Sequence, residues 1–123
     1  MPDQLSLVRL KYSENVTRES TNELEEFLSP DIWQQLGEKD RVLANEDFQR
    51  SLENNKIDSA SSWSNPDSGH SGGTTPTRTY SADSGGPCRE FVTSVVIEGE
   101  EQENHGAACR NSSGDDAFWE IVQ

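Results

Sequence analysis

The segment STNELEEFLSPDIWQQLG, residues 20–37, is the one stretch of this chain in which helical spacing coincides with a start signal and a stop signal. Its apolar residues recur every three or four positions, so on a helix they form one stripe, and acidic residues fill the opposite face. Ser20 and Glu23 form a capping-box pattern at the start, and Gly37 can close the helix in the left-handed conformation. The stripe consists of Leu24, Phe27, Leu28, Ile32 and Leu36, with Trp33 on its flank.

Pro30 lies in the middle of this segment and interrupts the helix. Proline has no amide hydrogen and clashes with the turn that precedes it. Ser29 before it is a good N-cap residue, and proline is favoured at the first position of a helix. We therefore expect two short helical turns that share one apolar face, the second of which begins at Pro30.

The composition favours disorder for most of the chain. Leu, Ile, Val and Phe make up 23 of the 123 residues, and the net charge is -13. This apolar content falls just below the roughly 20% under which a highly charged chain is usually disordered. We therefore predict a mostly intrinsically disordered chain with a transient amphipathic α-helix at about 20–37 and a weaker, solvated helix over 38–52. The alternative is a small α+β domain in which the central helix packs on strands at 4–12 and 91–97.

Shifts in composition divide the chain into four regions. The predicted regions are an N-terminal arm over 1–19, an acidic helical interaction region over 20–52, a disordered linker rich in Ser, Gly and Thr over 53–90, and an acidic tail with short β-type docking motifs over 91–123.

Two segments of the tail resemble motifs that add a strand to the exposed edge of a partner's sheet. Val95, Val96 and Ile97 precede an acidic run, which resembles a SUMO-interacting motif. Trp119 and Val122 stand three apart behind two aspartates, which resembles the motif that docks on ATG8-like proteins of the ubiquitin fold. The alternatives are an ordinary β-strand for the first segment and a generic acidic-aromatic docking motif for the second.

The chain also carries hydroxyl residues in contexts that kinases use. Ser29 and Thr75 precede proline, and Ser81 follows a basic residue by three positions. Ser68 and Ser71 lie in an Asp-Ser-Gly sequence that resembles a phosphodegron read by a ubiquitin-ligase adaptor. We expect these five residues to be sites of phosphorylation, with a plain flexible turn as the alternative for Ser68 and Ser71.

Nothing in the sequence indicates catalysis, a metal site or a cofactor. Cys88, Cys109, His70 and His105 lack the close paired spacing of metal ligands. No helix pattern follows the glycine pairs, so a phosphate-binding loop is not expected. A chain so poor in core residues cannot hold catalytic groups in place. We therefore predict that the protein is not an enzyme and binds neither a metal nor a cofactor.

The expected location is the cytosol or the nucleus. The sequence lacks the charged and apolar regions of a signal peptide and any apolar run of about eighteen residues. In a reducing compartment, Cys88 and Cys109 are expected to be free thiols. The acidic chain should be repelled by nucleic acids and anionic membranes, so we predict neither as a direct partner.

These observations favour an acidic, largely disordered regulatory or adaptor protein that recruits partners by coupled folding and binding. The expected partners have apolar grooves with basic rims, and SUMO-like or ATG8-like proteins are candidates. One alternative is a transcriptional activation or co-regulator protein that uses segment 20–37. Another is a viral phosphoprotein-like polymerase cofactor or host-factor antagonist. The predicted partner-binding residues are Leu24, Phe27, Leu28, Ile32, Trp33, Leu36, Val95, Val96, Ile97, Trp119 and Val122.

Overall fold

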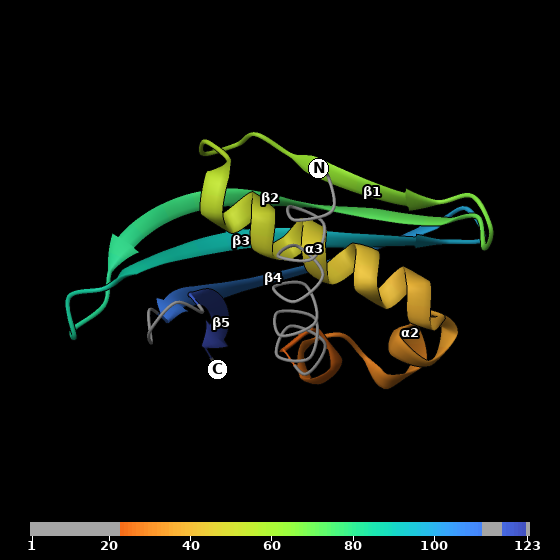
Figure 1. Cartoon of the computed structure of the whole chain (residues 1–123), viewed down its shortest axis with the longest axis horizontal. Coiled ribbons are helices and arrows are strands. Elements are labelled where there is room, and N and C mark those ends of the chain that lie inside the picture. The colour runs from red at the N-terminus through yellow and green to blue at the C-terminus, as the bar shows by residue number, and fades with distance from the viewer. Residues whose placement is uncertain (1–22, 112–116, 123) are drawn as a thin grey trace, which may run out of the picture.

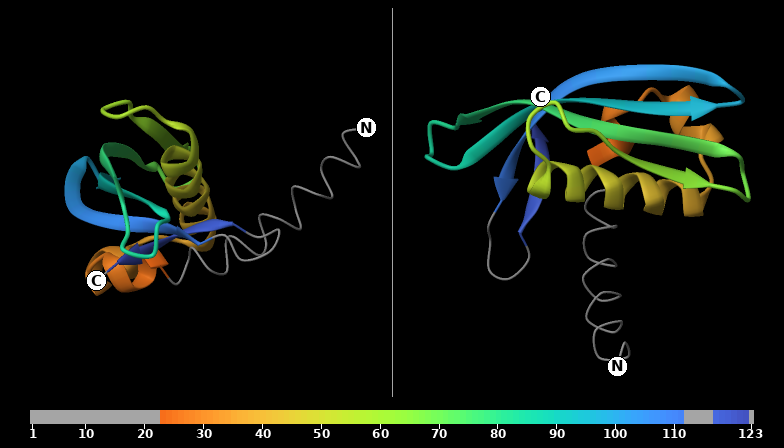
Figure 2. Two further views of the ribbon diagram at one scale, coloured as in Figure 1. Left: turned by 90° about the vertical axis from the view of Figure 1, so that its left-hand side faces the viewer. Right: turned by 90° about the horizontal axis from the view of Figure 1, so that it is seen from above.

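The protein folds around a five-stranded antiparallel sheet in which the order of the strands follows the chain. The structure, a computed structural model, describes residues 23–111 and 117–122. Figures 1 and 2 show the strands curling into a half-barrel around the longest helix. The elements are α2 (Pro30–Gln35), α3 (Glu38–Asn54), β1 (Ser61–Asn65), β2 (His70–Ser81), β3 (Pro87–Ile97), β4 (Glu100–Asn111) and β5 (Phe118–Val122).

The prediction of a mostly disordered chain is wrong, because the chain places its few apolar residues on one face of each element. The three tryptophans Trp33, Trp63 and Trp119 are all buried. Phe48 of α3 and Phe91 of β3 meet edge to face at the centre of the core, with ring centroids 5.1 Å apart. A threshold that counts only Leu, Ile, Val and Phe leaves out the tryptophans, each of which buries a large apolar area.

The segment around Pro30 folds as the sequence predicts. A helical turn covers residues 23–27, and α2 begins afresh at Pro30. Ser29 is the N-cap residue, and its Oγ accepts a hydrogen bond from the amide of Ile32 at 3.3 Å. The two turns share one apolar face, which is buried in the core of this chain.

The two ends of that segment differ from the prediction. Gly37 has an extended conformation, with φ -76°, and is the N-cap residue of α3, so it separates two helices without adopting the left-handed conformation. Ser20, the other half of the predicted capping box, lies outside the described residues. Glu23 accepts a hydrogen bond from the amide of Ile121, 98 residues away. The Glu23 carboxylate therefore makes a tertiary contact with β5.

The helix α3 occupies the predicted range but is not solvated. Phe48 and Leu52 pack onto the sheet, and polar side chains share the same buried face. Asp47 is fully buried, and this burial raises the pKa of its carboxyl. Because the buried face mixes polar and apolar residues, the sequence shows only a weak apolar stripe here. The buried polar residues of α3 are Asp40, Asn45, Asp47, Gln49 and Ser51.

Residues 61–81, predicted as part of a disordered linker, form β1 and β2. Gly72 lets these strands pack closely, because a Cβ atom added to it would lie 2.6 Å from Nε1 of Trp63 and would clash with the carbonyl oxygen of Ser94. Pro76 lies at an irregularity in the pairing of β2 with β3 and beyond the residues of β2 that pair with β1. Its missing amide therefore interrupts no ladder with β1. Small residues occur in these strands because the close packing of Trp63 and of β3 against β2 leaves no room for larger side chains.

Replacing Gly72 by alanine should lower the free energy of unfolding by about 2 kcal/mol, since the new methyl group overpacks the Trp63 indole and the β3 backbone. Urea unfolding followed by tryptophan fluorescence measures the change. Gly86→Ala is the matched control, because an added Cβ there meets nothing closer than 3.9 Å. Equal effects of the two substitutions would show that the close packing at Gly72 is not limiting.

The hairpin of β3 and β4 explains two features of the sequence. Glu98 and Gly99 have φ 53° and 80°, so they form a two-residue turn with both residues left-handed. The strand given as the alternative for 91–97 is present as part of β3. Cys88 and Cys109 stand opposite each other in the register of this hairpin and form a disulfide. The prediction of free thiols is therefore wrong.

Candidate functional site

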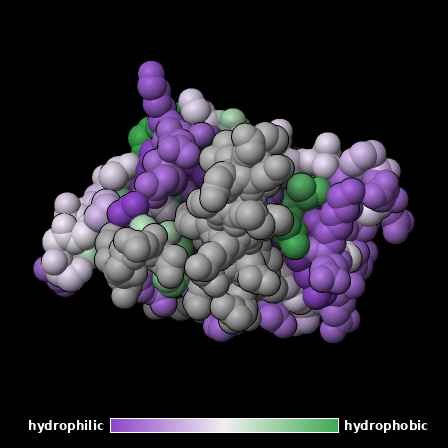
Figure 3. Space-filling model, in the orientation of Figure 1, coloured by the Kyte–Doolittle hydropathy of each residue, from purple (hydrophilic) through white to green (hydrophobic). Residues whose placement is uncertain are grey.

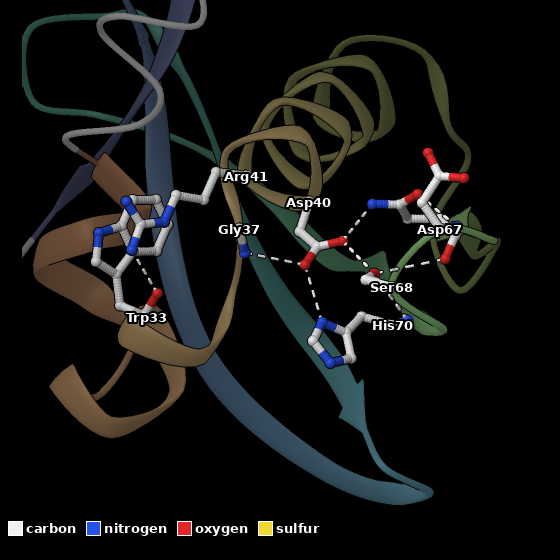
Figure 4. A network of polar contacts seen from close by, with 8 residues as sticks. Trp33, Gly37, Asp40, Arg41, Asp67, Ser68 and His70 are labelled. Carbon is white, nitrogen blue, oxygen red and sulfur yellow. Dashed lines mark hydrogen bonds and ion pairs between the residues drawn. The ribbon is translucent and has the colours of Figure 1, made fainter.

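A buried carboxylate joins the start of α3 to the turn between β1 and β2, as Figure 4 shows. Asp40 Oδ1 accepts hydrogen bonds from Nδ2 of Asn65 and from Oγ of Ser68, each at 2.7 Å. Its Oδ2 accepts from the Gly37 amide at 3.0 Å and lies 2.8 Å from Nδ1 of His70. An ionised carboxylate only accepts hydrogen bonds, so Nδ1 is the ring nitrogen that carries the proton. All four partners therefore favour the charged form of Asp40.

These contacts shift the protonation of Asp40. Burial on its own raises the pKa of this carboxyl, but hydrogen bonds from Ser68, His70, Asn65 and the Gly37 amide together outweigh it and lower the pKa from 3.8 to about 2. Each donor interacts more strongly with the carboxylate than with the neutral acid. The network is therefore charged at neutral pH, with its negative charge held in the interior.

The lowered pKa makes stability depend on pH. The stabilisation is fully present above pH 3.8, the ordinary value, and is lost as the pH falls through about 2. A shift of this size corresponds to about 2 kcal/mol of unfolding free energy. Urea unfolding at several pH values should show Asp40→Asn to be less stable than the parent at pH 6, with the gap closing towards pH 2. A gap that stays constant with pH would contradict a charged Asp40.

The presence of serine, histidine and aspartate does not make this network a hydrolytic triad. In a triad the serine hydroxyl donates to the histidine, which in turn donates to the aspartate. Here Ser68 Oγ donates directly to Asp40 and accepts from the backbone amide of His70. Within the described residues no hydrogen bond joins Ser68 Oγ to the imidazole ring. The arrangement therefore holds a turn in place and lacks the order of hydrogen bonds that defines a triad.

The network fixes a polar turn at the surface of the protein. Residues 66–69 are exposed, although Ser68 is bonded to a buried carboxylate. An ion pair of 2.9 Å between Lys39 and Asp67 adds a second link from α3 to the same turn. The guanidinium of Arg41 stacks over the Trp33 ring at 4.3 Å and so ties α2 to α3 nearby. The chain therefore presents this turn in one defined shape.

The sheet face opposite α3 carries a shallow groove of about 480 Å³ across β1 to β4. Its floor consists of small residues such as Ser62, Gly73 and Ser94, which are neighbours across three strands. Val92 and Val96 add apolar area, and glutamates of β4 form one rim. One polar face is the usual state of an antiparallel sheet whose other face is covered.

Side chains seal the outer edge of β5, the last strand. Gln49 of α3 donates through Nε2 to the carbonyl of Trp119 at 2.8 Å and accepts from its amide through Oε1 at 2.7 Å. The amide group of Gln49 thus occupies the place of a neighbouring strand. The Glu23 carboxylate accepts from the next outward amide, that of Ile121. This edge is therefore closed to strand addition.

The structure places most of the predicted partner-binding residues in the core of the chain itself. Phe27 is partly buried against Phe91, with ring centroids 5.5 Å apart. Val96 is half-buried on the groove face, and Val122 is half-exposed on β5. A partner could reach the buried residues only if the domain opened. These buried residues are Leu24, Leu28, Ile32, Trp33, Leu36, Val95, Ile97 and Trp119.

The predicted phosphorylation sites are not gathered in one place. Ser29 caps α2, and Ser68 belongs to the Asp40 network. Ser71 and Thr75 lie in β2 and are partly buried, while Ser81 is exposed at the end of that strand. Phosphate on Ser68 would remove its hydrogen bond to Asp40 and place like charges together. Modification of the five residues stays a prediction.

The face shown in Figure 3 is mainly hydrophilic among the described residues, with apolar atoms visible only in separate spots. No helix in the described part of the chain is both long and apolar enough to cross a membrane. Among the same residues, no cluster of three His, Cys, Asp or Glu side chains could hold a metal ion.

The sequence signal for the Asp40 network was the short spacing of Asn65, Ser68 and His70 around a glycine, but nothing in the sequence identified Asp40 as their partner.

Comparison with known proteins gives one consistent result. The chain matches the family described as 17 kDa outer membrane surface antigen over residues 50–120. Proteins named 17 kDa surface antigen from Rickettsia felis and Rickettsia conorii are 40% and 41% identical over 87 residues, which is 71% of this chain and 53% of each relative. The protein of that name from Rickettsia prowazekii is 40% identical over 85 residues.

The chain spans about half the length of the curated relatives it matches. The matched region begins in the last two turns of α3 and includes β1 to β4, the first three residues of β5 and the disulfide. No solved structure gives a significant match.

Proposed function

Because this chain belongs to the family of 17 kDa outer membrane surface antigens, we propose that it is exported and serves as a disulfide-bonded, non-enzymatic domain of a cell envelope. Its work there is to present a stable surface to other molecules. The family match covers the half-barrel itself, so the proposal concerns the folded domain and not a peripheral segment.

The disulfide is the observation that carries this proposal. Disulfides persist in oxidising compartments, including the bacterial periplasm and the cell surface, and are rare in the cytosol. Cys88 and Cys109 join the two long strands β3 and β4, and Cys88 is fully buried. A covalent link inside the sheet would help a small domain to survive outside the cell, where no chaperone of the cytosol can refold it.

The family membership corrects several predictions from composition. A disordered adaptor, a transcription co-regulator and a viral polymerase cofactor are all contradicted by the match to a surface antigen family. The predicted location in the cytosol or nucleus and the predicted lack of any link to a membrane are contradicted by the same match. Docking on SUMO-like or ATG8-like proteins finds no support, and the motif residues Val95, Ile97 and Trp119 are buried.

The absence of enzyme activity remains part of the proposal. Support comes from the Asp40 network, in which the carboxylate beside the Ser68 hydroxyl is a weak base, because four hydrogen bonds hold it and its pKa is lowered to about 2. The groove on the opposite face is open and lined by small side chains. Both features suit a surface that binds rather than a site that excludes water for chemistry.

Fractionation of the source cell and thiol labelling together test the proposal. Antibodies against the domain should detect it in the outer membrane fraction, and a thiol-alkylating reagent should label neither cysteine until a reductant is added. A cytosolic protein released by the same lysis is the control for leakage. Recovery in the cytosolic fraction with both cysteines alkylated would overturn the proposal.

A further inference from the structure

The outer edge of β4 is covered by β5 at one end of the strand and is open at the other end, among the described residues. The strand β5 pairs with β4 only from Ala107 to Asn111. From Glu100 to His105, β4 has β3 on one side and, among the described residues, no strand on the other. An unpaired edge exposes a row of amide and carbonyl groups that a further strand can bind. The sealed edge of β5 shows that this chain closes such edges elsewhere.

A pocket lies beside this open edge. It has a volume of about 290 Å³ and lies between α2 and the β3–β4 turn. Its apolar wall consists of Ile32 and Ile97, while the carboxylates Glu98 and Glu100 contribute negative charge. The apolar wall suits the methylene stem of a lysine or arginine, and the carboxylates suit its charged end.

Side chains on the helix-covered face of β4 line this pocket, Glu100 and Gln102 among them. Glu100, Gln102 and Asn104 stand opposite Ile97, Val95 and Thr93 in the register. The Nδ2 atom of Asn104 is buried and has no acceptor among the described residues. A strand laid along β4 would pair with the backbone amides and carbonyls of this edge that face away from β3.

The charge of the region selects the partner. The glutamates Glu98, Glu100, Glu101 and Glu103 flank the open edge, and none of the ion pairs in the described part of the chain involves them. Adjacent carboxylates without cations repel one another, so a basic partner is favoured. A second copy of this chain is disfavoured because each copy carries a net charge of -13.

We propose that the edge of β4 from Glu100 to His105 binds an extended, basic segment of a partner protein, which adds a strand to the sheet and places a lysine or arginine in the pocket beside Ile32 and Glu100. Backbone hydrogen bonds supply affinity in this mode of recognition, and alternate side chains supply specificity. The inference does not rest on where the protein is located, so its failure would leave the proposed function unaffected.

Titration of the isotope-labelled full chain with short peptides tests this. A peptide that alternates lysine and valine should shift backbone amide signals from Ile97 to His105. The same peptide with alternate amides N-methylated should bind about ten-fold more weakly, because it lacks half of the edge hydrogen bonds. A peptide that alternates glutamate and valine should not bind.

Paired variants separate the pocket from general attraction. Glu98→Gln with Glu100→Gln should weaken binding about ten-fold. Glu25→Gln with Glu26→Gln is the matched control, since these exposed residues lie on the helical turn at 23–27 and the net charge changes equally. An equal loss in both variants, undiminished binding of the N-methylated peptide, or self-association of the free chain through β4 would each overturn the proposal.

Discussion

Replacing Phe48 by alanine is expected to lower the free energy of unfolding by about 4 kcal/mol. The side chain is fully buried between α3 and the sheet, and its ring meets that of Phe91 at an angle of 82°. The substitution removes apolar contacts, leaves a cavity and breaks this edge-to-face pair. Since small domains are stable by only about 5 to 15 kcal/mol, a large fraction of the total is lost.

Urea unfolding followed by circular dichroism measures this effect. Val122→Ala is the control, because Val122 is 50% exposed on β5 and its truncation creates no cavity. The control should change stability by less than about 1 kcal/mol. A loss below that value for Phe48→Ala would show that the interface between α3 and the sheet contributes little to folding.

Reduction of the Cys88–Cys109 disulfide is expected to lower the free energy of unfolding by about 3 kcal/mol. The bond joins residues separated by 21 positions, and in the unfolded chain it removes the conformational freedom of that loop. The folded state loses little, since the register of β3 and β4 already holds the two residues opposite each other. Reduction should therefore lower the free energy of unfolding by giving the unfolded chain more conformational freedom, and the strands of the folded state should stay unchanged.

Unfolding in urea with and without a reductant gives this difference directly. The double variant Cys88→Ala and Cys109→Ala is the matched control, and reductant should not change its stability. The parent after reduction and the double variant should agree within about 1 kcal/mol. Alkylation of both cysteines confirms that the parent is reduced. If its free energy of unfolding is then unchanged, the disulfide does not stabilise the fold by restricting the unfolded chain.

The parts of the fold that local chemistry decides could be predicted from the sequence. Ser29 and Pro30 specify the start of α2, because a hydroxyl accepts an amide there and proline needs none. The range of α3 followed from its charge pattern and its sparse apolar residues. The strand alternative for 91–97 rested on the return of apolar residues there, of which β3 places Phe91, Val95 and Ile97 on the buried face.

The parts that depend on distant contacts could not be predicted in this way. Serine, glycine and threonine in residues 61–81 are common in linkers, and only the packing of Trp63 over Gly72 makes them suitable for strands. Asp40 reads as one more surface charge until the turn that carries Ser68 and His70 folds against it. The pairing of the cysteines could have been predicted from the sequence, since Cys88 and Cys109 are equidistant from the turn at Glu98 and Gly99.

The meander order of the sheet implies a sequence of events in folding. Each strand pairs with its neighbour in the chain, so the hairpins β1–β2, β2–β3 and β3–β4 close short loops and can form early. The contacts of Gln49 with Trp119 and of Glu23 with Ile121 join residues 70 and 98 positions apart and close the half-barrel. That closure has the highest entropic cost and so comes last. By the same reasoning β5 is the first strand to detach when the native protein breathes, and the hairpin with the disulfide is the last structure to melt.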